Sequence, residues 1–315
     1  MATISAARPA GQPSTAARAG REQSRARYPD ATGTVERNGV RIAYEVHGAG
    51  DPAILFLPTW SIIHSRTWKF QVPYFARRHR VVTFDGRGNG LSDRPAAVDA
   101  YAAEQFADDA LAVLDATGTR RPILVGFSLG AQTALLLASR RPERVGGIVL
   151  IAPAVPTGPV VPRSQALAEF EARRDTHDGW DKWNRHYWLS GYTDFVEFFF
   201  GRVFSEPHST KQIEDCVGWA LETAPETLIA TVLARALEDE QEVRSLVARV
   251  HCPVVVVHGT DDDVRPYESG AMLAEMAPGL LVTLAGSGHA PHARDPVRIN
   301  LAIRDFLAGR SRVAR

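Results

Sequence analysis

The chain has 315 residues, enough for one large hydrophobic core with or without an inserted subdomain. Its 36 Lys and Arg residues balance 36 Asp and Glu residues, so the charge gives no reason to expect nucleic acid or a membrane surface as a partner. No apolar run is long enough to span a bilayer, and the two cysteines, Cys216 and Cys252, are too few and too far apart for a disulfide framework or a metal site, which favours reduced thiols in the cytoplasm.

The first segment of the chain, to about residue 32, has the composition of a disordered tail. It is rich in Ala, Arg, Ser, Pro and Gly and has little apolar content. Such a segment cannot bury enough surface to offset the entropy lost on ordering, so we predict disorder over residues 1–32. The segment lacks the continuous apolar region of a secretory signal, and a transit peptide is the alternative.

Strand patterns begin at Thr34. Apolar and polar residues alternate on both sides of Asn38-Gly39, a pair typical of tight hairpins, and this predicts two antiparallel strands over 34–46. The unbroken apolar runs 53–57 and 80–85 predict strands that are covered on both faces, with a helix over 68–78 between them.

Helices and strands then alternate along the chain, which predicts a parallel sheet with right-handed crossovers and ligands beyond the carboxyl ends of the strands. The expected elements are a helix over 101–117, a strand ending at the Gly-rich stretch 126–130, a helix after Gly130, strands over 145–151, 253–258 and 280–284, and a last helix over 296–308.

The alternation stops between about residues 154 and 234, where aromatic residues crowd together. We predict an inserted helical cap over 154–234, which divides the rest of the fold into 33–153 and 235–315. Rings at helical spacing usually pack against one another. If they face a pocket instead, Trp183 and Trp188 are candidate substrate contacts and the substrate carries an apolar or aromatic acyl group. The crowded rings are Trp180, Trp183, Tyr187, Trp188, Tyr192, Phe195, Phe198, Phe199, Phe200, Phe204 and Trp219.

The stretch 126–130 carries the pattern Gly-x-Ser-x-Gly between a strand and a helix. A serine on so tight a bend needs neighbours without side chains two positions away, which Gly126 and Gly130 provide. The bend would expose the hydroxyl of Ser128 at a helix N-terminus, where developing negative charge is favoured. This context favours Ser128 as a nucleophile, and the alternative is a turn that only connects the two elements.

Three further motifs accompany the serine motif in a fixed order: Asp-Gly-Arg-Gly-Asn-Gly-Leu-Ser over 85–92, Gly-Thr-Asp-Asp-Asp over 259–263 and Gly-Ser-Gly-His over 286–289. With these motifs, nearly everything after residue 33 resembles the α/β-hydrolase superfamily. The resemblance implies an α/β fold with a mostly parallel eight-stranded sheet, flanking helices and an inserted helical cap. It also implies a nucleophile, an acid and a histidine in that chain order, and no cofactor or metal.

A serine hydroxyl needs a histidine to accept its proton and a carboxylate to hold that ring in the useful tautomer. His289 stands in a Gly-flanked loop after a late strand, whereas His292 lies three residues on and His258 ends a strand, where a structural role is expected. The resemblance places the acid three residues after Gly259, which selects Asp262 from three consecutive aspartates.

The loop after the strand 53–57 departs from the superfamily's pattern. The resemblance assigns one backbone donor for the oxyanion to Leu129 and the other to this loop. The loop contains Leu-Pro-Thr-Trp in place of the common His-Gly form. Counting from the end of the strand selects Trp60 as the residue that supplies this second backbone amide, and its indole would form part of the pocket wall. The chain is similar to a subgroup with this loop, which implies no particular substrate. Phe127 and His64 are candidate substrate contacts, with surface or packing as the alternative for His64.

These features together predict an enzyme: a serine hydrolase that acts on a carboxylic ester, a lactone or a related small acyl compound. Carbon–carbon bond hydrolysis, acyl transfer and cofactor-free perhydrolysis use the same triad and remain open, whereas Ser128 argues against the aspartate-nucleophile enzymes of this fold. A small-molecule receptor with a silent triad is the alternative from a different class, favoured by the altered loop. Nothing in the sequence indicates an oligomeric state.

Overall fold

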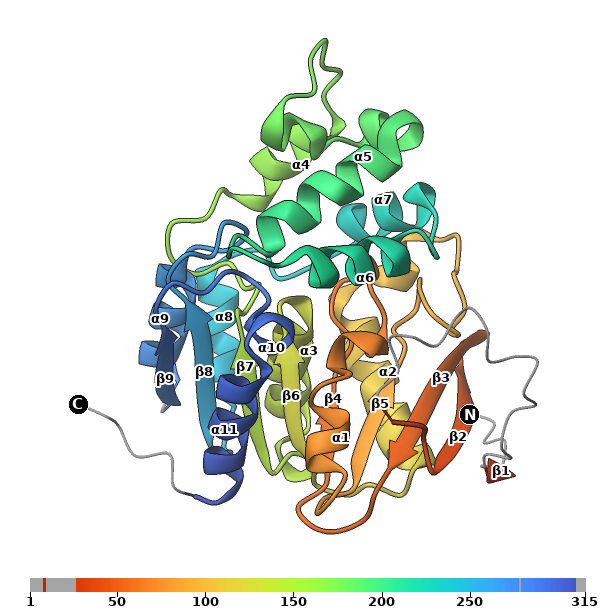
Figure 1. The fold of residues 1–315 in the computed structure, drawn as a ribbon, viewed down its shortest axis with the longest axis vertical. Coiled ribbons are helices and arrows are strands. Elements are labelled where there is room, and N and C mark those ends of the chain that lie inside the picture. Colours follow the sequence, from red (N-terminus) through yellow and green to blue (C-terminus); the bar gives the residue numbers. More distant parts are fainter. Residues whose placement is uncertain (1–7, 10–26, 278, 310–315) are drawn as a thin grey trace.

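A nine-stranded sheet forms the centre of the computed structural model, which describes residues 8–9, 27–277 and 279–309 (Figure 1). The strand order is β1-β2-β3-β5-β4-β6-β7-β8-β9, with β1, β2, β3 and β5 paired antiparallel and the rest parallel. The strands are β1 Arg8–Pro9, β2 Ala31–Arg37, β3 Val40–His47, β4 Ile54–Phe56, β5 Val81–Phe84, β6 Ile123–Phe127, β7 Gly147–Ile151, β8 Val254–Gly259 and β9 Gly279–Leu284.

The hairpin at Asn38-Gly39 is confirmed. Both residues have positive φ, 52° and 75°, the geometry that joins tightly twisted antiparallel strands. Arg37 pairs with Val40 directly across the turn.

The sheet differs from the prediction at its first edge. β1 adds a ninth strand inside the segment predicted to be disordered, and β2 begins at Ala31, so its first two residues lie inside that segment. The rest of the predicted tail, over 1–7 and 10–26, lies outside the described residues.

The prediction of a single helix over 68–78 is wrong. A 3-10 turn, η2, covers Ser65–Trp68, and a single α-helical turn, α1, covers Val72–Phe75. Pro73 lacks the N–H that a continuous helix would need at this point, so the helix begins afresh with proline in its first turn.

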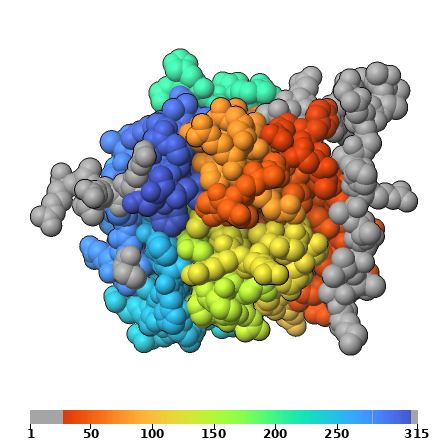
Figure 2. Space-filling view, turned by 90° about the horizontal axis from the view of Figure 1, so that it is seen from below, coloured from red at the N-terminus to blue at the C-terminus, as the bar shows by residue number. Residues whose placement is uncertain are grey.

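Helices cover both faces of the sheet (Figure 1), and alternate residues of each central strand enter two separate cores. Seen from below, the orange segment of α1 and the dark blue segment of α11 lie on one side of the molecule, and the yellow segment of α2 and the cyan segment of α8 lie on the other (Figure 2). Leu124 of β6 joins the core under α2, α3, α8 and α9, while Ile123 and Val125 join the core under α1 and α11. This two-sided burial is what the unbroken apolar runs predict. These helices span Ala103–Ala116 (α2), Leu129–Arg140 (α3), Glu240–Val247 (α8), Tyr267–Met276 (α9) and Pro296–Leu307 (α11).

Four helices between β7 and α8 lie together above the carboxyl ends of the strands, and we call them the cap segment (Figure 1). Its longest helix, α5, begins after Asn184, whose side chain accepts hydrogen bonds from two backbone amides of the first turn, and it kinks at Gly191. The helices are α4 Arg163–Glu171, α5 Arg185–Val203, α6 Thr210–Ala220 and α7 Pro225–Leu233. All four lie within the range predicted for the cap.

Short helical turns connect the larger elements: η3 Val98–Tyr101, η4 Pro142–Arg144, η5 Gly179–Lys182 and α10 Pro291–Arg294. Within the described part of the chain, no helix has both the length and the apolar character that crossing a membrane requires. The same residues hold no group of three or more His, Cys, Asp or Glu side chains that is arranged for a metal ion.

Candidate active site

Ser128 occupies a strained bend between β6 and α3. Its φ of 53° and ψ of −117° lie in a region that residues with side chains rarely adopt. The surrounding backbone holds this bend: the Ser128 amide donates to the Ile151 carbonyl at 2.9 Å, and the amides of Ala131 and Ala154 donate to the Ser128 carbonyl at 3.0 and 3.1 Å. The bend is therefore fixed by three hydrogen bonds to neighbouring segments.

The two glycines that flank Ser128 leave no room for a side chain. A Cβ at Gly126 would lie 2.2 Å from the carbonyl oxygen of Gly130, and a Cβ at Gly130 would lie 2.6 Å from the carbonyl oxygen of Pro58. Both obstacles are backbone atoms, which cannot rotate away. The Gly-x-Ser-x-Gly pattern is thus a steric requirement of this bend.

We expect Gly126→Ala to lower kcat/KM on a chromogenic ester by at least about 10²-fold, because the added methyl group must displace the backbone that positions Ser128. Gly201→Ala is the matched control, since nothing lies within 4 Å of the Cβ it would add on α5. Steady-state kinetics, with melting temperatures of both variants, make the comparison. Wild-type turnover in Gly126→Ala would contradict the steric account.

The three residues predicted as a triad lie within hydrogen-bonding distance of one another. His289 Nε2 is 3.1 Å from Ser128 Oγ, and His289 Nδ1 is 2.7 Å from Asp262 Oδ2. They come from three separate places at the carboxyl edge of the sheet: the end of β6, the loop after β8 and the loop after β9. The side chains of His289 and Asp262 are 3% and 0% exposed, so this hydrogen-bonded chain is screened from bulk water.

The carboxylate of Asp262 has every acceptor position engaged. Its Oδ1 accepts from the backbone amides of Val264 and Arg265, both at 2.8 Å, and its Oδ2 is 3.0 Å from His258 Nε2. Burial acts to raise the pKa of this carboxyl, but the charge of His289 and the hydrogen bonds outweigh it and lower the pKa well below its usual range. Asp262 therefore stays ionised at neutral pH and holds the His289 ring from behind.

The neighbouring aspartates and the rival His258 take other positions. Asp261 accepts a hydrogen bond from the Thr260 hydroxyl, and Asp263 lies 3.5 Å from Arg202, both at the surface. His258 shares its Nε2 between Asp262 and the Arg265 carbonyl, so it orients the acid and does not reach Ser128. No local sequence feature connects His258 with Asp262.

The rival His292 is buried in the wall beside the triad. Its Nε2 lies 2.7 Å from Thr67 Oγ1, and its ring packs against Phe127 and Trp68 at centroid distances of 4.4 and 4.8 Å. Burial, with the charge of His289 as a second cause, lowers the pKa of His292 from 6.5 to about 3. His292 is therefore a neutral ring at physiological pH.

This depressed pKa predicts a stability change with pH. Below pH 6.5 His292 binds a proton in the unfolded chain but not in the folded protein. The free energy of unfolding therefore decreases as the pH is lowered, by up to about 1.4 kcal/mol per pH unit, until the pH reaches the folded pKa near 3. His292→Gln should remove that contribution. Urea unfolding between pH 4 and 7 measures the two slopes, and equal slopes would contradict the neutral-ring assignment.

A pocket of about 370 Å³ opens beside Ser128 and His289. The cap segment contributes aromatic and aliphatic side chains to its wall, and Phe127 lines it as predicted, with its ring centroid 4.9 Å from that of His289. We call it the apolar chamber. It is lined by Thr59, Trp60, Ile62, Ile63, Thr67, Phe127, Ser128, Phe199, Phe200, Val203, Phe204, Cys216, His289, Ala290 and His292.

Of the two predicted oxyanion donors, Trp60 lines this chamber, and Leu129 follows Ser128, which also lines it. In the part of the chain that the structure describes, no hydrogen bond uses the backbone N–H of Trp60 or of Leu129. The Trp60 indole Nε1 donates to Thr231 Oγ1 of α7 at 2.7 Å. Thr231 lies 171 positions along the chain from Trp60, and no sequence signal connects the two.

Trp183 and Trp188, which the sequence analysis considered as candidate substrate contacts, do not line the apolar chamber. Their rings pack behind the Trp60 indole, at centroid distances of 5.2 and 5.9 Å, and Trp188 is fully buried. This is the ring packing that the sequence analysis gave as the alternative to a substrate contact, and it holds Trp60 in place.

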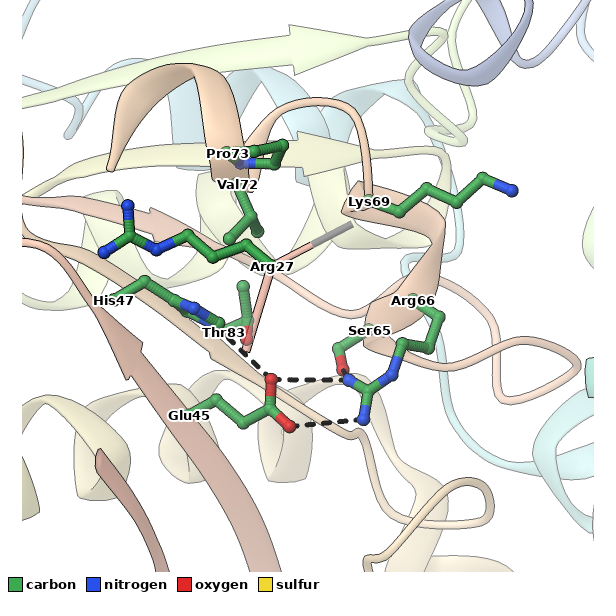
Figure 3. Close-up of a pocket in the computed structure, with 9 residues that line it drawn as sticks. All are labelled: Arg27, Glu45, His47, Ser65, Arg66, Lys69, Val72, Pro73 and Thr83. Carbon is green, nitrogen blue, oxygen red and sulfur yellow. Dashed lines mark hydrogen bonds and ion pairs between the residues drawn. The ribbon is translucent and has the colours of Figure 1, made fainter. Parts of the chain in front are cut away.

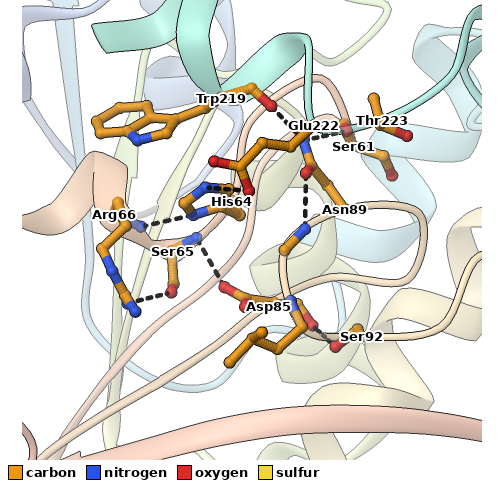
Figure 4. Close-up of polar contacts among 12 residues, drawn as sticks. Ser61, His64, Ser65, Arg66, Asp85, Asn89, Ser92, Trp219, Glu222 and Thr223 are labelled. Carbon is orange, nitrogen blue, oxygen red and sulfur yellow. Dashed lines mark hydrogen bonds and ion pairs between the residues drawn. The ribbon is translucent and has the colours of Figure 1, made fainter. Parts of the chain in front are cut away.

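His64 does not line the apolar chamber. Figure 4 shows it among Glu222, Trp219 and Arg66. Its Nε2 lies 3.6 Å from Glu222 Oε2, and its ring packs on Trp219 of α6 at 5.5 Å. Nearby, Asn89 Nδ2 donates to the carbonyls of Ser61 and Trp219. His64 therefore belongs to the contact between the sheet edge and the cap segment, the packing role that was its alternative.

A separate charged hollow of about 270 Å³ lies beside β3 and η2, and no triad residue lines it (Figure 3). Glu45 at its centre pairs with Arg66 at 3.2 Å and with His47 at 3.3 Å. Its other cations also have carboxylate partners, Asp30 for Arg27 and Asp215 for Lys69. Each arginine and lysine that lines the hollow therefore has a carboxylate partner.

The model of the alpha/beta hydrolase fold family matches residues 52–296. The chain belongs to the α/β-hydrolase family. It is therefore an enzyme of the hydrolase class, and its mostly parallel sheet with flanking helices is the architecture that the resemblance implied.

Relatives of this α/β-hydrolase act on several kinds of bond. A protein named "Putative carbamate hydrolase RutD" from Variovorax paradoxus (strain S110) is 29% identical over 84% of this chain and 95% of its own length. The 3-oxoadipate enol-lactonase 1 of Acinetobacter baylyi (strain ATCC 33305 / BD413 / ADP1) is 26% identical over 76% and 82%. The esterase EaEST from Exiguobacterium antarcticum shares the fold with a TM-score of 0.73 and 18% identity, over 86% of this chain and 97% of that one.

Proposed function

We propose that this α/β-hydrolase cleaves carboxylic esters or lactones through a Ser128–His289–Asp262 triad and an acyl-enzyme. One observation carries the proposal: a single buried imidazole lies 3.1 Å from a strained serine hydroxyl and 2.7 Å from an ionised carboxylate. This is the arrangement that turns a serine hydroxyl into a nucleophile.

The geometry supports the following course of reaction. Ser128 Oγ attacks the carbonyl carbon while His289 Nε2 takes its proton, and Asp262 stabilises the resulting imidazolium. The amides of Trp60 and Leu129 donate to the oxyanion, a contribution typically worth 10²- to 10³-fold in rate for each donor. His289 then protonates the leaving oxygen. Water, deprotonated by the same ring, attacks the acyl-serine, the bond between the acyl carbon and Ser128 Oγ breaks, His289 returns the proton to Oγ, and the carboxylic acid leaves.

The lining of the apolar chamber supports a substrate with an apolar group next to the reacting carbonyl. Aromatic rings of α5 and the aliphatic side chains of Ile62 and Ile63 face this space, and burial of an apolar group contributes about 25 cal/mol per Å². The names of the relatives, an enol-lactonase and a carbamate hydrolase, support small acyl compounds as the substrate class.

Fluorophosphonate labelling tests the proposal directly. A fluorophosphonate probe reacts only with an activated serine, so digestion and mass spectrometry of the labelled protein should place the adduct on Ser128. A panel of p-nitrophenyl esters and aliphatic lactones should be turned over by the same preparation. An adduct on another residue contradicts the triad, and the absence of both label and turnover favours the receptor alternative.

A further inference from the structure

The loop that carries His289 is bonded to residues 203–206, the end of α5 and the start of its connection to α6, which we call the clamp segment. The His289 amide donates to the Val203 carbonyl at 3.1 Å, and the Gly288 amide donates to Glu206 Oε1 at 2.7 Å. Within the described part of the chain, no other hydrogen bond engages the backbone of these two loop residues. The clamp segment therefore supplies the acceptors that hold the backbone at the catalytic histidine.

Gly288 lets the clamp segment approach the histidine loop closely. A Cβ at Gly288 would lie 2.8 Å from Ser205 Oγ, 3.1 Å from Glu206 Oε2 and 3.2 Å from the Val203 carbonyl oxygen. These distances are too short for a water molecule to lie between the two segments. The contact is therefore direct at the residue that precedes the histidine.

The same connection between α5 and α6 also contacts the chain on either side of the triad residues. Ser205 Oγ donates to the carbonyl of Asp261, the residue before the acid Asp262, at 3.1 Å. Arg294 of α10 donates to the Pro207 carbonyl at 2.8 Å. The acid loop and the helix that follows the histidine loop are thus bonded to one short stretch of the chain.

The clamp segment continues the helix that forms part of the wall of the apolar chamber. Phe199 and Phe200 of α5 line this chamber, and so do Val203 and Phe204 of the clamp segment. Val203 therefore lines the space beside Ser128 and also accepts the hydrogen bond from the catalytic histidine. One stretch of chain forms the wall of the substrate space and supports the triad.

We propose that Glu206 is a positioning residue for His289, through which the docking of the cap segment on the sheet sets the geometry of the triad. This inference rests on the proposed function and adds to it a residue outside the triad. Glu206 acts through the Gly288 amide: by fixing the histidine loop, it maintains the 3.1 Å distance between His289 Nε2 and Ser128 Oγ.

The kinetics of Glu206→Ala test this position. Its kcat on a p-nitrophenyl ester should fall about tenfold to a hundredfold, because a displacement of about 1 Å can cost that much in rate. Its KM should stay near the wild-type value, since the rings of the apolar chamber are unchanged. Glu206→Gln keeps an oxygen that accepts from Gly288 and should retain at least about a third of wild-type kcat. Glu197→Ala, at an exposed glutamate of α5, is the matched control and should equal wild type.

The pH dependence separates position from charge. Glu206→Gln removes the negative charge but keeps the hydrogen bond, so the acidic limb of its kcat/KM profile should coincide with that of wild type. A shifted acidic limb and a loss in kcat as large as that of Glu206→Ala would show that the charge acts instead, and would overturn the positioning role.

Hydrogen exchange tests the clamp without reference to activity. The amides of Gly288 and His289 should exchange at least about tenfold faster in Glu206→Ala than in wild type, and Glu206→Gln should keep their protection. Unchanged exchange, or faster exchange with unchanged kcat, overturns the inference. The rate of fluorophosphonate labelling separates the two proposals: wild-type protein without label on Ser128 refutes the proposed function, whereas equal labelling rates in wild type and Glu206→Ala refute only the positioning role.

Discussion

Replacing Ser128 with alanine should lower kcat/KM on any ester that the wild type turns over by about 10⁴- to 10⁶-fold. The substitution removes the atom that forms the acyl-enzyme and leaves only the oxyanion donors and binding. Fluorophosphonate labelling should disappear with it, while the melting temperature stays close to that of wild type because the alanine keeps the same backbone contacts. Fixed-time assays at high enzyme concentration measure the residual rate of the Ser128→Ala variant.

The triad acts as a unit, and this supplies the control for Ser128→Ala. His289→Ala should lose a similar factor, and the double variant should lose no more than either single variant, because the proton acceptor has no task without the hydroxyl. Additive losses would show that His289 acts elsewhere. Full activity in Ser128→Ala would require another nucleophile and refute the proposal.

Replacing Asp109 with alanine should destabilise the fold by about 3–5 kcal/mol. Arg87, in the loop after β5, makes two hydrogen bonds of 2.7 Å to the carboxylate of Asp109 on α2, and the two residues are 2% and 0% exposed. Arg37 at the end of β2 reaches the same carboxylate at 2.8 Å. Without the carboxylate, the Arg87 charge stays buried with no counter-charge, although its hydrogen bond to the Ala100 carbonyl remains.

Urea unfolding followed by circular dichroism measures this loss. The double variant Arg87→Met/Asp109→Leu should recover more than half of it, because an apolar pair removes the buried charge along with its partner. Asp115→Ala is the surface control: its pair with Arg144 is also 2.7 Å long but solvent-exposed, and should contribute less than about 1 kcal/mol. Equal stability of Asp109→Ala and wild type would contradict the account.

Local patterns predicted most of the sheet and the nucleophile bend. The elements expected over 80–85, 101–117 and 145–151 correspond to β5, α2 and β7. They were predictable because apolar runs and helical periodicity show which side chains of a segment must be buried, whatever the segment packs against. The prediction of one helix over 68–78 was wrong because it rested on the spacing of apolar residues and did not take Pro73 into account. Pro73 interrupts the backbone hydrogen bonding of a helix at that point.

The positions of Ser128, His289 and Asp262 were predictable because each sits in a loop whose glycines and order along the chain are local features. The contacts of Trp60, His64, Trp183 and Trp188 were not. Thr231 and Glu222 lie more than 150 residues from the loop that they contact. Whether a ring lines a chamber or packs behind another ring depends on how the cap segment docks on the sheet, and docking is a property of the assembled fold.

The amino-acid pattern alone sets where the backbone must bend, which faces of the strands are buried and which residue types are available for acyl chemistry, since these depend on neighbours in the chain. Only the packed molecule decides which space surrounds the reacting serine. The indole of Trp60 is held in the wall of that space because a threonine on a distant helix accepts its hydrogen bond, and no short-range pattern records which distant helix will lie there.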